Sequence, residues 1–260
     1  RYVAIHMSDG SSGSDDIWIF DTTTGGGMPL LRNPASESDA VWSPDDRHVM
    51  FSQDGLAFLQ GTVGTDQPIR PLFRSAAGEI YPNDWSRDGR WLVYSDFSNS
   101  WADLWLLSLS DASPRAIPFR RTPSGEHQAR FSPDSRWVAY TSEESGRPEV
   151  YAQGMPPNNQ RLLVSSGGGT QPMWSGDGRE LYYLAANGAI LATPFDDQTS
   201  TPVVGRPQVL FYAPSNGGDF IGVRNHYAVT GDGQRFLVRR PLRGGSWAFT
   251  VISNWTNRSR

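Results

Sequence analysis

The sequence predicts an all-β chain built from repeated antiparallel sheets. Three observations carry this prediction: a short turn motif recurs along the 260 residues, an alternating run of aromatic and β-branched residues follows each copy, and 27 Gly and 19 Pro punctuate the chain. Short alternating runs bounded by Gly, Pro, Asp and Ser are typical of strands and hairpins. No run predicts a helix of more than about two turns.

The repeated motif has the form aromatic-Ser-Pro-Asp-Gly-Arg. Its first copy is Trp42-Ser43-Pro44-Asp45-Asp46-Arg47; later copies begin at Trp85, Phe131 and Trp174, and a degenerate one at Val229. In such a motif Pro presets the first turn dihedral, Asp caps nearby N–H groups, and Gly adopts the positive φ that follows. We therefore predict a tight hairpin in each repeat, with the repeated carboxylates acting as turn caps rather than as a catalytic or calcium-binding set: Asp45, Asp88, Asp134, Asp177 and Asp232.

Strand-like segments follow each hairpin. The second strands are expected near residues 47–52, 90–95, 136–141, 179–184 and 234–240. Two later runs in most repeats supply a third and a fourth strand, and four short strands in a repeat of this length are typical of a β-propeller blade. We therefore predict a six-bladed β-propeller of four-stranded antiparallel blades. It forms a single domain over residues 1–260, with blades at about 1–32, 33–74, 75–121, 122–165, 166–213 and 214–260.

The first and last blades are expected to be incomplete in this sequence. Residues 1–5 align with the second-strand residues 47–51, and the final repeat supplies about three strands. An uncovered sheet edge leaves backbone N–H and C=O groups unpaired. We expect either residues upstream of Arg1 or a strand donated by another chain to cover the edge near residues 2–6. The second alternative would give strand-mediated self-association.

Composition excludes several classes of chemistry. Cys is absent and all 23 basic residues are Arg, which excludes thiol catalysis, Cys-ligated zinc, iron–sulfur clusters, a P-loop lysine and a Schiff-base lysine. The four His show no metal-binding spacing, so no metal and no cofactor is expected. Scattered Arg and a net charge of −4 do not predict nucleic-acid binding. No apolar run is long enough to predict a transmembrane segment in this chain.

Polar and ionisable residues precede the hairpin motif at similar offsets in several repeats. The first strand of a propeller blade lines the central channel, so these residues are expected near one mouth of that channel. A group of carboxylates, imidazoles and Arg around a concave mouth is typical of a binding site, although a solvated entrance without a ligand is the alternative. The candidate ligand-binding residues are Glu37, Asp39, Tyr81, Glu126, His127, Arg130, Gln171, Arg224 and His226.

The Trp-Ser-Pro-Asp-Gly-Arg hairpin, together with the later strand Asp103-Leu104-Trp105, resembles the Pro-Asp repeats of TolB-type propellers. Prolyl oligopeptidase-type peptidases carry similar repeats. The last segment, including His226-Tyr227-Ala228-Val229-Thr230 and Thr250-Val251-Ile252-Ser253-Asn254-Trp255, resembles the C-terminal sensor propellers of bacterial Ser/Thr kinases and winged-helix regulators. The resemblance implies a propeller fold and a bacterial sensor or adaptor module. No Gly-x-Ser-x-Gly elbow is present, so the peptidase relatives imply no catalysis here.

Three functional hypotheses follow. The first is a non-catalytic propeller, periplasmic or extracellular, that binds a protein or a small-molecule ligand at the channel mouth. The second is an enzyme of the lyase, lactonase or glycosidase type at the same mouth, with Glu37, Glu126, His127 and His226 as acid–base candidates. The third is a self-assembling structural protein joined through open blade edges.

Overall fold

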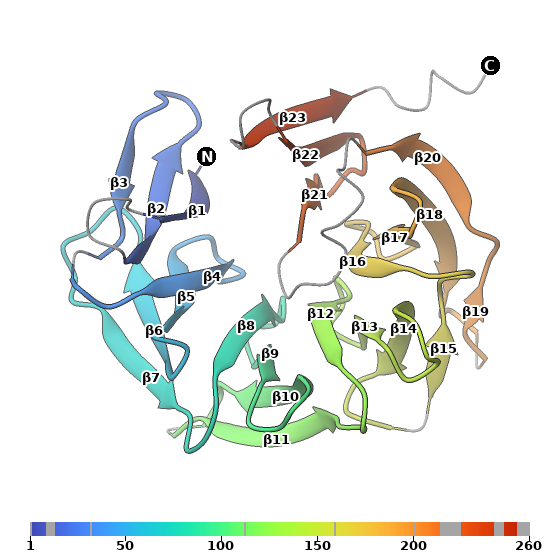
Figure 1. Ribbon diagram of the computed structural model, residues 1–260, viewed down its shortest axis with the longest axis horizontal. Helices are drawn as coiled ribbons and strands as arrows, with labels where there is room; N and C mark the ends of the chain where they lie inside the picture. The colour runs from blue at the N-terminus through green and yellow to red at the C-terminus, as the bar shows by residue number, and fades with distance from the viewer. Residues whose placement is uncertain are drawn as a thin grey trace. The chain divides into compact units, whose positions relative to one another are not determined.

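The computed structural model describes residues 2–8, 14–31, 33–111, 113–158, 160–199, 201–213, 225–241 and 247–253. These residues form 23 strands and no helix (Figure 1). It follows that nothing in this described part is a helix able to span a bilayer. The chain divides into two compact units, Arg1–Arg121 and Thr122–Arg260, and each is described by itself.

The first unit contains three antiparallel sheets whose strands follow one another in sequence. The first sheet has the order β1-β2-β3: β1 (Tyr2–Ser8), β2 (Asp15–Asp21) and β3 (Gly27–Pro29). The second has the order β4-β5-β6-β7: β4 (Glu37–Trp42), β5 (His48–Gln53), β6 (Ala57–Thr62) and β7 (Arg70–Arg74). The third has the order β8-β9-β10-β11: β8 (Ile80–Trp85), β9 (Trp91–Asp96), β10 (Asp103–Ser108) and β11 (Arg115–Arg120).

The second unit also contains three antiparallel sheets. One consists of β12 (Glu126–Phe131), β13 (Trp137–Ser142), β14 (Glu149–Gly154) and β15 (Arg161–Leu163). The next consists of β16 (Thr170–Trp174), β17 (Glu180–Leu184), β18 (Ala189–Asp196), β19 (Val203–Val204) and β20 (Gln208–Tyr212). The last consists of β21 (Tyr227–Val229), β22 (Arg235–Pro241) and β23 (Trp247–Ser253).

The second strands β5, β9, β13, β17 and β22 confirm the positions that the hairpin motif predicts. The sheet that contains β16 departs from the four-strand expectation, because it has five strands. Its third strand, β18, is eight residues long. The beginning of β18 pairs with β20 and its end pairs with β19, so two short segments share the place of one outer strand.

In each hairpin motif a side-chain hydroxyl bonds both the turn Asp and a backbone N–H at the start of the next strand; we call this pair of hydrogen bonds the hydroxyl clamp. In the β8–β9 turn, Ser86 Oγ donates to Asp88 Oδ1 at 2.6 Å and accepts from the Trp91 N–H at 2.9 Å. Asp88 Oδ1 also accepts from the Arg90 N–H at 3.0 Å. The same bonds recur at Ser43, Ser132 and Ser175, and in the degenerate copy a threonine, Thr230, makes them. The repeated Asp residues are therefore turn caps, as predicted.

The second strands β5 and β17 have buried side chains on both faces of their sheets. In β5, Val49 and Phe51 pack in a cluster with β2, whereas Met50 packs in a cluster with β8, β9 and β10. In β17, Leu181 and Tyr183 pack against the sheet of β13 and β14, whereas Tyr182 packs against β21 and β22. Successive side chains of a strand point to opposite faces, so one alternating run fills two interfaces. Face-to-face packing of consecutive sheets is the arrangement of propeller blades.

We expect Ser86→Ala to destabilise the first unit by about 1–3 kcal/mol, because the partly buried Trp91 N–H loses its acceptor and the fully buried Ser86 hydroxyl is removed. Urea unfolding of both proteins measures the difference. Thr65→Ala removes a hydroxyl from an exposed turn in the same unit and is the matched control. Its effect should stay within about 0.5 kcal/mol. Equal losses in the two variants would contradict the clamp.

Candidate functional site

The candidate residues lie on or beside the first strands of successive sheets. Glu37 and Asp39 lie in β4, and Tyr81 lies in β8, all in the first unit. In the second unit β12 carries Glu126, His127 and Arg130, β16 carries Gln171, and His226 immediately precedes β21. Arg224 lies outside the described residues. Within each unit the first strands are near neighbours, since β4 packs beside β8 and β12 beside β16.

A left-handed backbone residue interrupts three of these strands. Asp39, Gln128 and Gln171 have φ values of 54°, 60° and 58°, and each lies three residues before the aromatic residue of its hairpin motif. The strand pairing shifts register at each of these positions. Such conformations are uncommon for residues other than glycine and cluster at functional sites. In β8 the equivalent residue is Pro82, whose ring holds φ negative.

In the second unit these left-handed residues carry a chain of hydrogen bonds from sheet to sheet. Gln128 Oε1 accepts from the Gln171 N–H at 2.9 Å and from Thr141 Oγ1 at 2.9 Å. Gln171 Oε1 in turn accepts from the His226 N–H at 2.6 Å, and its Nε2 lies 3.4 Å from His226 Nδ1. The Tyr227 hydroxyl donates to the Gln171 carbonyl at 2.8 Å. The structure thus brings Gln171 and His226 together, with Gln128 as a link that the sequence analysis did not select.

Arg130 joins the same group through Asn225. When the amide of Asn225 is oriented with its oxygen toward Arg130, that oxygen accepts from both Nη2 and Nε of the guanidinium, the latter at 3.3 Å. Arg130 is half-buried, and its carbonyl accepts from Trp174 Nε1 at 3.1 Å. Side chains and backbone from β12, β16 and the segment before β21 are therefore connected through polar contacts.

Glu126 and His127 begin β12 and are both buried. Ser142 Oγ donates to Glu126 Oε1 at 3.3 Å, and Thr122 Oγ1 donates to the same oxygen. Burial lowers the pKa of His127 to about 4, so the imidazole is neutral at physiological pH. Its Nε2 is shielded from solvent and makes no hydrogen bond among the described residues. A buried polar atom without a partner is rare, so this nitrogen requires an explanation.

Gly125 leaves room for one methyl group beside the Nδ1 edge of His127. A methyl group at Gly125 would lie 3.8 Å from His127 Nδ1 and 3.8 Å from the carboxylate carbon of Glu143. The missing side chain therefore leaves a small gap bordered by an imidazole and a carboxylate. Neither Gly125 nor Glu143 belongs to the repeated pattern, so the repeats give no signal for a site at either residue.

Glu37 is fully buried in the first unit. Burial, and after it the nearby negative charge of Asp16, raise the pKa of its carboxyl to about 7. Neither carboxyl oxygen makes a hydrogen bond of good geometry among the described residues. The partner Asp16 was missed at the sequence level. It has the same place in its repeat as Asp103 and Glu149, two buried carboxylates that have cationic partners.

Comparison of Asp16 with Asp103 and Glu149 explains the raised pKa of Glu37. Asp103 accepts from Arg121 Nε at 3.2 Å, and Glu149 accepts from Arg147 Nε at 2.7 Å and from the Gly168 N–H at 3.0 Å. Asp16 instead faces a second carboxyl group, Glu37. Two neighbouring carboxyl groups favour sharing one proton, because like charges raise the pKa of one of them.

The arrangement provides buried groups that can form hydrogen bonds. Among the residues that the structure describes, no three His, Asp or Glu side chains are gathered as ligands for a metal ion. The buried groups instead include one neutral imidazole and one carboxyl group that titrates near neutrality. Such groups donate and accept hydrogen bonds and can transfer protons.

We expect stability to fall as pH rises from about 4.5 to 7, because the unfolded chain releases the Glu37 proton at lower pH than the folded chain does. The loss should reach about 3 kcal/mol. Glu37→Gln should remove this decline and be more stable than wild type at pH 8, as measured by urea unfolding across the pH range. Asp66→Asn, in an exposed loop of the same unit, is the control. A decline that persists in Glu37→Gln would contradict the assignment.

Comparison with known proteins identifies the fold. No protein-family model matches the chain. The chain is 28% identical over 169 residues to the Tol-Pal system protein TolB of Wolinella succinogenes; the match covers 61% of this chain but only 38% of that TolB. The crystal structure of TolB from Acinetobacter baumannii superposes with a TM-score of 0.73 at 15% identity, over 97% of this chain and 61% of that one.

An oligogalacturonate lyase in complex with manganese superposes with a TM-score of 0.66 at 14% identity, over 98% of this chain and 72% of that one. At these identities the structural similarities establish the fold alone. The chain has a TolB-like β-propeller fold, as the hairpin motif predicted. The closer resemblance to kinase-associated sensor propellers stays a prediction.

Proposed function

We propose that this TolB-like propeller is a non-catalytic binding module that takes a ligand where its first strands begin. The observation that carries the proposal is the buried, neutral imidazole of His127, whose Nε2 has no partner among the described residues. The cost of desolvating such a nitrogen is offset when a ligand or an ordered water completes its hydrogen bonding. Figure 1 shows β12, the strand that positions this imidazole.

Two further features support a ligand at this position. Gly125 leaves space beside His127, and the Gln128–Gln171–His226 chain fixes the neighbouring backbones. Fixed polar groups reduce the entropy lost on binding. Because His127 is neutral, we infer that the ligand recognised here is a protein segment or small molecule that offers hydrogen-bonding groups.

The similarity to TolB supports a periplasmic or extracellular location and an adaptor or sensor role. TolB itself is a component of the Tol-Pal system, as its name states. Because the chain spans under two fifths of that relative, partners of the whole TolB are proposals for this chain. The single-domain organisation and an assembly contact near residues 2–6 also remain proposals.

We expect His127→Leu to leave the melting temperature unchanged or raised, because it replaces an unpaired buried nitrogen with apolar atoms. The same change should abolish retention of the natural ligand. Immobilised wild-type and variant proteins are exposed to bacterial envelope extract, and the retained species are identified by mass spectrometry. Gly125→Ala should also lose the ligand while remaining folded, because its methyl group fills the space beside His127.

His48→Leu is the matched control, because His48 lies at the hairpin end of a second strand and forms a partly exposed pair with Asp45. It should retain the ligand. A lower melting temperature for His127→Leu would show that the imidazole is structurally satisfied. That result, or the absence of any species that distinguishes wild type from both variants, would overturn the proposal.

One observation favours an enzyme as the second candidate. The pKa of Glu37 near 7 suits a general acid or base at neutral pH. Propellers that resemble this chain include an oligogalacturonate lyase and putative 6-phosphogluconolactonases. We expect no turnover of oligogalacturonate or 6-phosphogluconolactone by the chain. Turnover by the wild-type chain that is lost in Glu37→Gln or His127→Leu would show that the protein is an enzyme and would overturn the binding proposal.

A further inference from the structure

A second hollow lies in the second unit, at the hairpin ends of the strands. Its volume is about 670 Å³, within the range of small-molecule binding clefts. The β12–β13 turn, the β16–β17 turn and the residues around the end of β18 form its walls. Because β12 begins at Glu126 and its hairpin follows Phe131, this cavity and the His127 site lie at opposite ends of β12.

Three aromatic side chains form the rigid back of the cavity. Trp137 and Phe195 meet edge to face with ring centroids 5.2 Å apart, and Trp174 and Phe195 meet at 90° with centroids 4.9 Å apart. All three are buried, and they belong to a core cluster shared by two sheets. This wall is therefore a fixed part of the core and gives the hollow a defined apolar surface.

Two further carboxylate residues, from two elements, line the cavity. Asp177 belongs to the β16–β17 turn, and its Oδ1 accepts from Ser175 Oγ and from the Arg179 N–H. These bonds lower the pKa of Asp177, so the group is ionised at neutral pH. Asp196 ends β18, and its Oδ1 accepts from the Gln198 N–H at 3.0 Å. Among the described residues, the second oxygen of each carboxylate accepts no hydrogen bond.

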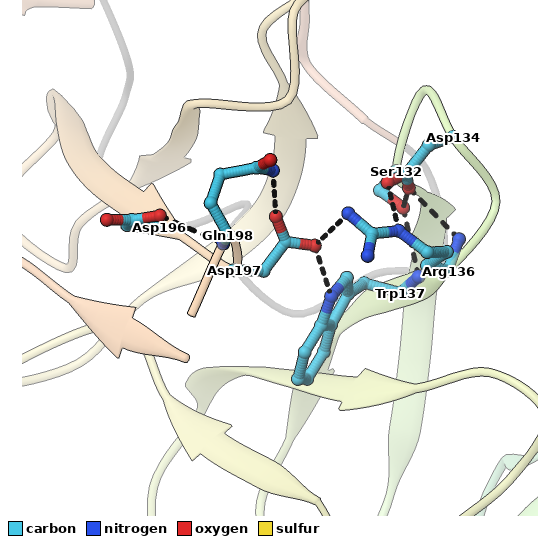
Figure 2. Close-up of polar contacts among 7 residues, drawn as sticks. All are labelled: Ser132, Asp134, Arg136, Trp137, Asp196, Asp197 and Gln198. Carbon is cyan, nitrogen blue, oxygen red and sulfur yellow. Dashed lines mark hydrogen bonds and ion pairs between the residues drawn. The ribbon is translucent and has the colours of Figure 1, made fainter. Parts of the chain in front are cut away.

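One guanidinium of the protein, that of Arg136, already pairs with two carboxylates of the cavity wall. Figure 2 shows its guanidinium between Asp134 and Asp197: Nε contacts Asp134 Oδ2 at 2.6 Å and Nη2 contacts Asp197 Oδ2 at 2.8 Å. Trp137 Nε1 donates to the same Asp197 oxygen at 2.9 Å. Asp197 is thus held against the aromatic wall, and Asp177 and Asp196 also line the cavity.

We propose that this cavity binds the guanidinium of an arginine-bearing peptide segment from a partner protein. A guanidinium is planar, pairs with carboxylates through two N–H groups and packs on aromatic rings, so it matches both kinds of wall. An ammonium group lacks the planar surface and is more strongly hydrated. This second site is independent of the one proposed at His127.

The test uses three short peptides of the form acetyl-Gly-X-Gly-amide, with X as arginine, lysine or citrulline. Citrulline has nearly the shape of arginine but no charge. Binding is followed by the indole N–H signal of Trp137 in ¹H–¹⁵N spectra of the full chain, assigned with Trp137→Phe. We expect the arginine peptide to shift this signal saturably, and the citrulline peptide to bind about tenfold more weakly.

The double variant Asp177→Asn/Asp196→Asn should bind the arginine peptide about tenfold more weakly than wild type does. The asparagine carbonyl at position 177 still accepts from Ser175 and Arg179, so the turn is kept. Asp88→Asn changes the equivalent turn residue in the first unit, where it also removes an ion pair with Arg90, and this variant should bind the arginine peptide like wild type. The proposal fails if the arginine peptide gives no saturable shift up to about 10 mM. It also fails if the citrulline peptide binds equally, or if Asp88→Asn weakens binding as much as the double variant does.

Discussion

The structure depends on one local interaction, the hydroxyl clamp in the hairpin between the first and second strands of a repeat. A serine or threonine oxygen donates to the turn Asp and accepts from the first N–H of the next strand. This clamp fixes the strand register, and a shift of one residue would turn every side chain to the opposite face. Both faces of β5 and β17 are buried, so the sheets cannot pack unless the clamp holds.

The same clamp sets the position of the polar residues at the strand starts. Counting back from the hairpin, the left-handed residue always falls three positions before the aromatic residue, at Asp39, Gln128 and Gln171. In the second unit its side chain accepts the backbone N–H of the following first strand. A strained backbone conformation thus connects sheets through a hydrogen bond while apolar faces supply most of the packing energy.

The sequence was sufficient to predict the fold and the second strands, because the turn chemistry repeats and strand alternation has a strict period of two. It also placed Gln171 and His226 on neighbouring strands. It could not predict the Glu37–Asp16 pair, since Asp16 lies on a different sheet and only packing brings the two together. Gln128 and Gly125 were missed for a related reason: backbone strain and empty space at one position leave no compositional signal.

In the second unit a first strand supports different chemistry at each of its two ends, as β12 and β16 show. At its start, burial keeps His127 uncharged, and recognition there depends on hydrogen bonds between neutral groups. At the hairpin end, partial exposure and donated hydrogen bonds keep carboxylates such as Asp177 ionised. One oxygen of that carboxylate holds the turn, and the residue also lines the cavity. Asp88 and Asp134 direct their second oxygens to Arg90 and Arg136. Because the Asp177 turn needs only an acceptor and not a charge, the negative charge of Asp177 is available to a partner as well as to the neighbouring Arg179.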